Sequence, residues 1–297
     1  SLCEKSFGGK LFEQEGVLTV PASFDASARA LTVEAAGKAG LEKVTLLEEP
    51  QAALYAWLEA SGDGFRQHLK AGDVILVVDV GGGTSDFSLI SVGETDGNLE
   101  LERLAVGDHI LLGGDNMDLA LAYTLAEKLK AQDKVLDAWQ MAALTHACRV
   151  AKEKLFEDPA LAKAPVTIAG RGSSLLASTV KTELTREELT ALLTDGFFPV
   201  VAVSEQPQTP RGSGLRQMGL PYAADAAVTR HLAAFLSRQA RSLKTEGGKG
   251  KSFLHPTSVL FNGGVFKAQV LRERVLTVLN NWLKADGGDA LAELPGA

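Results

Sequence analysis

The stretch Val74-Ile75-Leu76-Val77-Val78-Asp79-Val80-Gly81-Gly82-Gly83-Thr84-Ser85-Asp86-Phe87-Ser88-Leu89 decides the fold. It begins with an unbroken apolar run, rich in Val and Ile and too short to cross a membrane. Such a run is typical of a strand that is buried on both faces. After Asp79 and Val80 come three glycines, and strand character resumes at Phe87. The pattern therefore predicts a β-hairpin whose tip is a glycine-rich turn.

The residue types at this tip favour binding of a phosphate together with a metal ion. Glycines adopt positive φ and let backbone N–H groups approach an anion, and Thr84 adds a hydroxyl donor. The alternative is a plain hairpin turn, which needs only two residues with positive φ and neither Asp79 nor Asp86. We expect the carboxylates to hold Mg²⁺ through water, because that ion keeps part of its hydration shell beside phosphates. A Walker loop or a dinucleotide fingerprint would open a helix at this point, and none follows.

The composition is that of a globular chain. It has 297 residues, of which 45% are hydrophobic and 23% charged, and its formal net charge is −7. The length predicts two domains or one large two-lobed domain. The acidic balance argues against a nucleic-acid or membrane-surface role, and no apolar run approaches a spanning helix. Cys3 and Cys148 make no disulfide framework, so we expect the reducing cytoplasm, and the scattered histidines show no zinc spacing.

Hydrophobic periodicity and capping residues predict the other elements. Strands are expected at residues 17–20, 44–47, 99–106 and 258–262, with a strand pair at 166–169 and 175–180. Helices are expected from Asp25, from residue 51, behind Gly113-Gly114, over 134–156, from Thr185 to about Val203, over 225–243 and after Gly264. Residues 204–221 are predicted to be an inserted loop, and the tail from residue 286 is predicted to be frayed.

Two sets of charged residues carry open interpretations. Glu48 and Glu49 stand at a strand-to-helix junction, where α/β folds place their ligands; they equally offset a helix dipole. Lys152 shares a helix with Arg149 and Lys154, and charge on a helix usually faces solvent. The residues alone do not decide between these alternatives.

Taken together, the motifs resemble the nucleotide-binding domain of the seventy-kilodalton heat-shock chaperones of DnaK type. The resemblance is collinear over most of the chain, and its most specific part is the phosphate loop of residues 79–86. The other motifs that carry it are residues 17–24, Glu49-Pro50-Gln51-Ala52-Ala53, Gly107-Asp108, Leu112-Gly113-Gly114-Asp115-Asn116-Met117-Asp118 and Asn262-Gly263-Gly264. Each is weak alone, but together, in the same order along the chain, they are specific.

The resemblance implies an actin-like ATPase (ribonuclease H-like) α/β fold, with two lobes around a cleft for Mg²⁺-ATP or ADP. It implies that Glu49, Asp79 and Thr84 serve hydrolysis, Glu49 and Asp79 by acting on the attacking water or, through water, on the metal. It also implies that Gly81, Gly82, Gly83 and Thr84 hold phosphates and that Lys152 lies near the ribose. The remaining nucleotide-binding positions would be Gly113, Gly114, Arg149, Glu153, Gly263, Gly264 and Lys267.

The chain also departs from the family's pattern. The family's first phosphate loop and its catalytic lysine have no counterpart, so we expect the first lobe to be incomplete. Arg149 stands where the family commonly has Glu, and Glu153 stands where it has Arg. Val265 and Lys267 replace a Ser and an Arg. A divergent relative is therefore expected, with an insertion at residues 204–222.

The expected organisation is a partial first lobe at 1–70, a second-lobe core at 71–107 and 193–297, and an outer subdomain at 108–192. The implied function is that of a chaperone ATPase domain coupled to polypeptide clients, a J-domain co-chaperone and an exchange factor. One alternative is a relative that senses nucleotide without hydrolysing it; another is a sugar or acetate kinase of the same superfold. Dimerisation across an exposed strand edge of the incomplete lobe is a further expectation.

Overall fold

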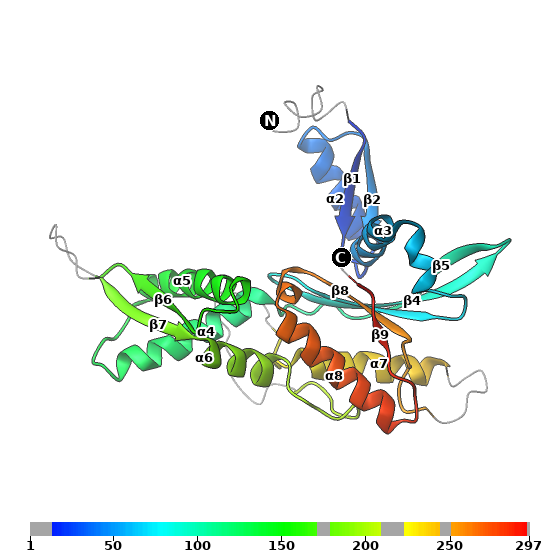
Figure 1. Cartoon of the computed structure of the whole chain (residues 1–297). Helices are drawn as coiled ribbons and strands as arrows, with labels where there is room; N and C mark the ends of the chain where they lie inside the picture. The colour runs from blue at the N-terminus through cyan, green and yellow to red at the C-terminus, as the bar shows by residue number, and fades with distance from the viewer. Residues whose placement is uncertain (1–13, 171–178, 209–222, 244–250, 296–297) are drawn as a thin grey trace.

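The computed structural model describes residues 14–170, 179–208, 223–243 and 251–295 (Figure 1). The strands are β1 Gly16–Val20, β2 Val44–Glu48, β3 Val74–Val80, β4 Ser85–Thr95, β5 Asn98–Val106, β6 Lys163–Ile168, β7 Val180–Thr185, β8 Ser258–Asn262 and β9 Ala292–Glu293. The helices are α2 Ala26–Lys38, α3 Glu49–Ser61, α4 Gly114–Lys130, α5 Ala138–Glu157, α6 Arg186–Ala191, α7 Val228–Leu243 and α8 Gln269–Ala285, with shorter turns η2 Gly62–Gln67, η3 Leu192–Phe197 and η5 Gly264–Lys267.

A mixed sheet of order β5-β4-β3-β8-β9 forms the centre of the molecule. The predicted hairpin is confirmed, because β3 and β4 pair antiparallel, while β8 lies parallel to β3 on its other side. The register sets Asp79 opposite Asp86 on β4 and opposite Asn262 on β8. Two neighbouring strands thus bring a carboxylate and an amide to Asp79 at one end of the sheet.

Helices cover both faces of this sheet, as the apolar run in β3 predicts. Leu76, Val78 and Val80 belong to the cluster beneath the sheet, which α7 and α8 close (Figure 1). Ile75 and Val77 point to the opposite face, where α3 packs. The alternation follows the two-residue period of a strand, so each face of β3 contributes to a separate apolar cluster.

The outer subdomain extends to one side of the sheet and contains α4, α5, β6, β7 and α6 (Figure 1). The capping box predicted at Thr185 is confirmed, since Thr185 Oγ1 accepts from the amide of Glu188 at 3.1 Å. Cys148 is fully buried in the core, as expected of a small apolar side chain.

Several predicted boundaries in the outer subdomain are wrong. The second strand of the β6–β7 pair lies at Val180–Thr185 rather than at 175–180, and residues 175–178 fall outside the described part of the chain. The long helix begins after Asp137, whose side chain caps it, and not at residue 134. A kink or restart is expected at Pro199, but the helix that Thr185 opens ends before it. The α-helix α6 continues as the π-helical turn η3 to Phe197, and residues 198–203 are irregular.

The smaller first lobe contains a parallel pair of strands, β1 and β2, flanked by α2. Asp25 caps α2 as predicted, accepting from the amide of Ala28 at 2.8 Å. Pro50 lies in the first turn of α3, where its missing N–H costs nothing. Dimerisation across an edge of this strand pair stays a prediction, as do the lobe boundaries at residues 70, 107 and 192.

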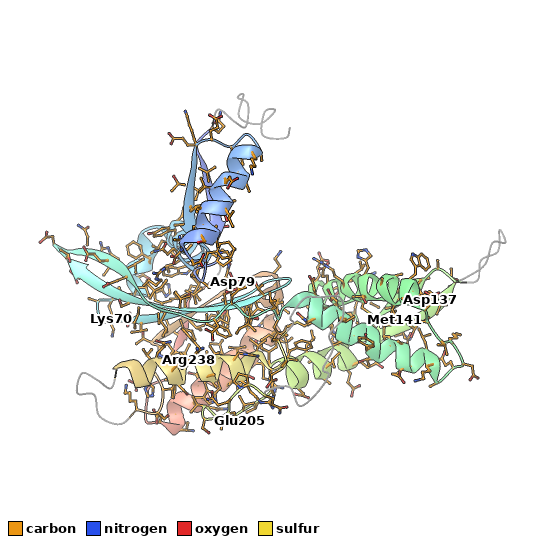
Figure 2. All side chains as sticks on the ribbon, turned by 180° about the vertical axis from the view of Figure 1, so that it is seen from behind. Lys70, Asp79, Asp137, Met141, Glu205 and Arg238 are labelled. Carbon is orange, nitrogen blue, oxygen red and sulfur yellow. The ribbon has the colours of Figure 1, made fainter. Side chains whose placement is uncertain are left out.

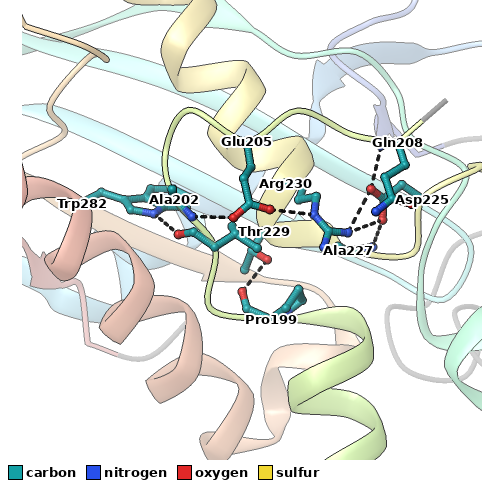
Figure 3. Close-up of polar contacts among 10 residues, drawn as sticks. Pro199, Ala202, Glu205, Gln208, Asp225, Ala227, Thr229, Arg230 and Trp282 are labelled. Atoms are coloured by element: carbon teal, nitrogen blue, oxygen red, sulfur yellow. Dashed lines mark hydrogen bonds and ion pairs between the residues drawn. The ribbon is translucent and has the colours of Figure 1, made fainter.

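Polar contacts hold the first residues of the predicted insertion, 204–208, as Figure 3 shows. Arg230 on α7 binds Glu205 at 3.1 Å and Asp225 at 3.1 Å. Asp225 in turn accepts from the backbone amide of Gln208 at 2.8 Å. Residues 204–208 are therefore tied to the start of α7, whereas residues 209–222 fall outside the described ranges. The helix begins at Val228, three residues later than predicted, since Asp225 is used for this network.

The tail is not frayed over its described part, residues 286–295. Leu291 and Leu294 are buried, and β9 extends the central sheet by pairing with β8. Trp57 on α3 donates its indole N–H to the carbonyl of Pro295 at 3.1 Å. The tail therefore closes the apolar cluster between α3 and the sheet, a long-range contact that local sequence composition does not reveal.

We expect Leu294→Ala to lower the free energy of unfolding by about 2–4 kcal/mol, because it removes a buried side chain from this cluster. Leu104→Ala, at an exposed position on β5, is the matched control and should change it by less than about 0.5 kcal/mol. Urea denaturation followed by circular dichroism measures both. Equal effects of the two substitutions would show that the tail does not pack as described.

Candidate functional site

Two glycine turns meet in direct backbone contact at one end of the sheet. The first follows β3, and the second begins α4. The amide of Gly114 donates to the carbonyl of Gly81 at 3.0 Å, and that of Asp115 donates to Gly82 at 2.7 Å. A Cβ atom on Gly113 would lie 2.6 Å from the Gly82 oxygen and 2.7 Å from the Gly81 oxygen. Glycine is therefore required at position 113 by the close approach of the two chains.

The hairpin tip keeps free backbone donors. Gly81 closes the turn by donating to the carbonyl of Thr84 at 2.9 Å. Within the described ranges, the amides of Gly82, Gly83 and Thr84 have no hydrogen-bond partner, and both glycines are exposed. Successive unpaired N–H groups in a turn form a concavity suited to an anion.

A third glycine turn approaches the same strand end from β8. Gly263 has φ +89°, and a Cβ atom there would lie 2.7 Å from Asp79 Oδ1 and closer still to the Val80 carbonyl. Both the backbone conformation and the contact exclude other residues. The turns after β3, before α4 and after β8 thus converge on Asp79 and Val80.

A cleft of about 560 Å³ opens beside these turns, within the size range of small-molecule sites. It lies between α4, α5, η5 and the first turn of α8. Eight of the predicted site residues line it: Gly81, Gly82, Gly114, Arg149, Lys152, Glu153, Gly264 and Lys267. The structure thus brings together residues that are up to 186 positions apart, from 81 to 267.

The cleft also has an apolar lining, of which the sequence analysis named only Val265 as a replacement at the nucleotide site. Its members are Met117, Phe156, Leu193, Val265, Ala268 and Leu271. Met117 and Val265 lie in or directly after motifs of the family resemblance. The other four have no local signal that marks them as cleft residues. Apolar surface beside a few polar groups is suited to a flat ring system.

Two ion-pair systems set the charge along the cleft. Lys152 Nζ lies 2.7 Å from Asp118 Oδ1, and both side chains are largely buried. Burial raises the pKa of Asp118, and the ion pair with Lys152 offsets only part of that effect. On the more exposed side, Arg149 binds Glu153 at 3.1 Å and approaches Asp115 at 3.7 Å. Lys152 is thereby held beside Gly114 at the start of α4.

The remaining predicted residues do not line this cleft. Gly113 and Gly263 make the backbone contacts described above, Gly83 and Thr84 form the hairpin tip, and Asp79 and Glu49 belong to a neighbouring carboxylate cluster. Figure 2 shows Asp79 near the point where the sheet, the first lobe and the outer subdomain meet.

The carboxylate cluster consists of Glu49, Asp79 and Asp86, with His109 beside it. Burial raises the pKa of Asp79, and the charge of Asp86 raises it further. A hydrogen bond from Asn262 at 2.7 Å lowers this pKa but does not cancel the increase. Burial also raises the pKa of Glu49, with further contributions from Asp79 and Asp86 and an opposing one from His109. His109 Nδ1 lies 2.8 Å from Asp86 Oδ1. His109 had no predicted role, although it follows the Gly107-Asp108 motif.

We expect Gly113→Ala to lower the free energy of unfolding by about 1–3 kcal/mol, because its Cβ would meet rigid backbone oxygens. Gly83→Ala is the control, since a Cβ there meets nothing within 4 Å and φ is not positive. It should change stability by no more than about 0.5 kcal/mol. Chemical denaturation compares them, and a tolerated Gly113→Ala would contradict the turn-to-turn contact.

The raised carboxyl pKa values predict how stability depends on pH. The folded protein keeps protons on Asp79 and Glu49 where the unfolded chain has lost them, so stability falls as pH rises above the ordinary Asp value of 3.8. Asp79→Asn removes the part of this loss of stability that comes from ionisation of Asp79, because the amide does not titrate.

At pH 7, without added metal, the Asp79→Asn variant should therefore be more stable than the wild type by on the order of 1 kcal/mol. The difference should vanish near pH 3. Asp289→Asn, at an exposed position, is the control. Urea titrations at several pH values measure the difference, and a gain for Asp79→Asn that stayed constant with pH would argue against this origin.

Comparison with known proteins identifies the family of this chain. Within the described residues no helix is long and apolar enough to span a membrane. A stretch of 145 residues is 38% identical to the chaperone protein DnaK of Psychrobacter cryohalolentis, covering 48% of this chain and 21% of that protein. The chain therefore corresponds to a limited part of that relative. Residues 4–206 match the family described as Hsp70 protein. Since this match covers more than half of the chain, the protein belongs to the Hsp70 family.

Proposed function

We propose that this chain is the ATP-binding and ATP-hydrolysing part of a chaperone, with an actin-like ATPase fold. One observation carries the proposal: the cleft of about 560 Å³ has a turn with free backbone donors at its edge and lies next to a carboxylate cluster. A nucleotide has the matching parts, namely a flat base, a ribose and a chain of phosphates that binds a divalent cation. The mixed sheet with helices on both faces supports the fold.

In the proposed binding mode, the phosphates lie at the hairpin tip, on the amides of Gly82, Gly83 and Thr84. Gly81 and Gly113 act indirectly, by holding the two turns together. The ribose lies near Lys152, which Asp118 holds in place. The adenosine lies over Gly263 and Gly264, with Gly114, Arg149, Glu153 and Lys267 around it.

The carboxylate cluster fits a Mg²⁺ ion bound through water. Three carboxylates repel one another there, and a cation would relieve that repulsion. In the part of the chain that the structure describes, no three His, Cys, Asp or Glu side chains come close enough to bind one metal ion directly. Asp79 and Glu49 would therefore orient the metal's water shell and the attacking water. Bound Mg²⁺ would supply charge neutralisation for phosphoryl transfer.

The exchange of charges at Arg149 and Glu153 supports a retained site. The two side chains bind each other at 3.1 Å, so the pair keeps one positive and one negative group at the cleft despite the reversed order. This observation favours nucleotide binding in the divergent chain.

The finer parts of the proposal extend beyond this chain. Hydrolysis in the longer protein would be coupled to polypeptide clients, with a J-domain co-chaperone and an exchange factor, in the cytoplasm. The alternative is a relative that binds nucleotide as a sensor and never hydrolyses it. An ATPase assay on a longer form that includes the family's first phosphate loop separates the two, because only the chaperone reading predicts phosphate release.

Calorimetric titration of ADP with Mg²⁺ tests the binding proposal. We expect the wild-type chain to bind weakly and Asp79→Ala to reduce the affinity about tenfold, a loss of about 1.4 kcal/mol. Glu94→Ala removes the same charge at an exposed position far along β4 and should leave the affinity unchanged. Absence of wild-type binding, or equal losses in both variants, would contradict the proposed site.

Turnover by this chain alone should be very slow, because the family's catalytic lysine has no counterpart in it. A phosphate-release assay with Mg²⁺-ATP measures this. Rapid hydrolysis that Asp79→Ala abolishes would mean that the residues present here suffice for catalysis and would overturn this prediction.

A further inference from the structure

Glu48 joins the first lobe to the central sheet. It is the last residue of β2, and its Oε1 accepts hydrogen bonds from two guanidinium groups. Arg29 of α2 donates at 2.6 Å, and Arg103 of β5 donates from the other side. Glu48 itself is only 8% exposed. We call these three residues the Glu48 junction.

The lowered pKa of Glu48 favours its ionised form in the junction. Burial raises the pKa of Glu48, but the hydrogen bonds and charges of Arg103 and Arg29 outweigh it, so the pKa is lowered overall. Removing Arg103 would leave this largely buried carboxylate with Arg29 as its remaining cation, and such a loss of compensation for a buried charge is destabilising. The Glu48–Arg103 pair therefore opposes separation of β2 from β5, two strands that belong to different sheets.

The second carboxylate oxygen of Glu48 lies beside a cavity that has room for one water molecule. Glu48 Oε2 and Ser88 Oγ are both buried, and neither has a hydrogen-bond partner among the residues that the structure describes. Both residues line one cavity of about 10 Å³, which is the room that one water needs. A water there would link Glu48 to Ser88 on β4, adding a second connection between the first lobe and the sheet.

The next residue along the chain is Glu49, whose charge interacts with those of Asp79 and Asp86. The apolar side chains that anchor α3, Leu54 and Trp57, lie one to two turns further on. They fix the body of the helix, while Glu48 fixes the residue that precedes its first turn. We propose that the Glu48 junction is a positioning element that holds Glu49 opposite Asp79 across the two lobes.

The effect of the junction on nucleotide binding rests on the proposed function. Its effect on the position of the first lobe can be tested without nucleotide. Spin labels at Ala35→Cys on α2 and Asn98→Cys on β5, in a Cys3→Ser background, report the distance between first lobe and sheet by pulsed electron paramagnetic resonance. Cys148 is buried and its pKa is raised to about 12, so it should not react with the label.

We expect Arg103→Ala to broaden or shift the distance distribution and Arg103→Lys to restore part of it. Arg274→Ala, which breaks an ion pair with Asp195 away from the junction, should have no effect. An unchanged distribution in Arg103→Ala would overturn the proposal, whether or not the chain binds nucleotide.

A double-mutant cycle on the Mg²⁺-dependent affinity for ADP then tests the link to Glu49. Arg103→Ala and Glu49→Gln should each weaken binding about tenfold, and the double variant should lose no more than either alone. Losses that multiply would overturn positioning through Glu49. If the wild type binds no ADP, the proposed function fails, while the distance measurement still decides whether the junction fixes the lobes.

Discussion

The structure depends on a backbone contact that only glycine permits. The turn after β3 and the turn before α4 touch through the amides of Gly114 and Asp115, and Gly113 leaves no room for a Cβ atom. This contact attaches the outer subdomain to the central sheet at the end of β3. The walls of the cleft come from α4 and α5 on one side and from η5 and α8 on the other. Their relative position therefore follows from the approach of two glycine turns, reinforced by Gly263 from β8.

Negative charge is concentrated at the same end of β3, and this clustering of carboxylates destabilises the folded state. Asp79 and Asp86 are paired across β3 and β4, and like charges directly opposite each other are unfavourable in a sheet. Asn262 donates a hydrogen bond to Asp79, and His109 Nδ1 lies within hydrogen-bonding distance of Asp86. Such an arrangement is typical of a functional site, where carboxylates with raised pKa values serve a ligand. The glycine contact keeps these groups in place although their mutual repulsion opposes it.

Much of the fold could be predicted because its signals are local. A pattern of only a few residues predicts an element in each of these cases: the apolar run of β3, the caps at Asp25 and Thr185, and the glycine turns. The predictions are wrong where contacts between residues far apart in sequence determine the structure. Residues 286–295 look frayed from their composition, but Trp57 and β8 bind them in the folded protein. The site follows the same division. Its glycines belong to motifs, whereas Phe156, Leu193 and Leu271 become cleft residues only through the packing of helices far apart in sequence.

Glu48 and Glu49 show why residue type and spacing are insufficient even within a recognised motif. They are neighbours of the same chemistry, yet their pKa values move in opposite directions. The chain turns from strand to helix between them, so one side chain faces two arginines and the other faces two aspartates. A carboxylate paired with cations is a structural link, while one held among anions is unsatisfied until a cation or proton arrives. Because the two are consecutive, any movement of the link is transmitted directly to the unsatisfied group. This joins the packing of the lobes to the chemistry proposed at Asp79.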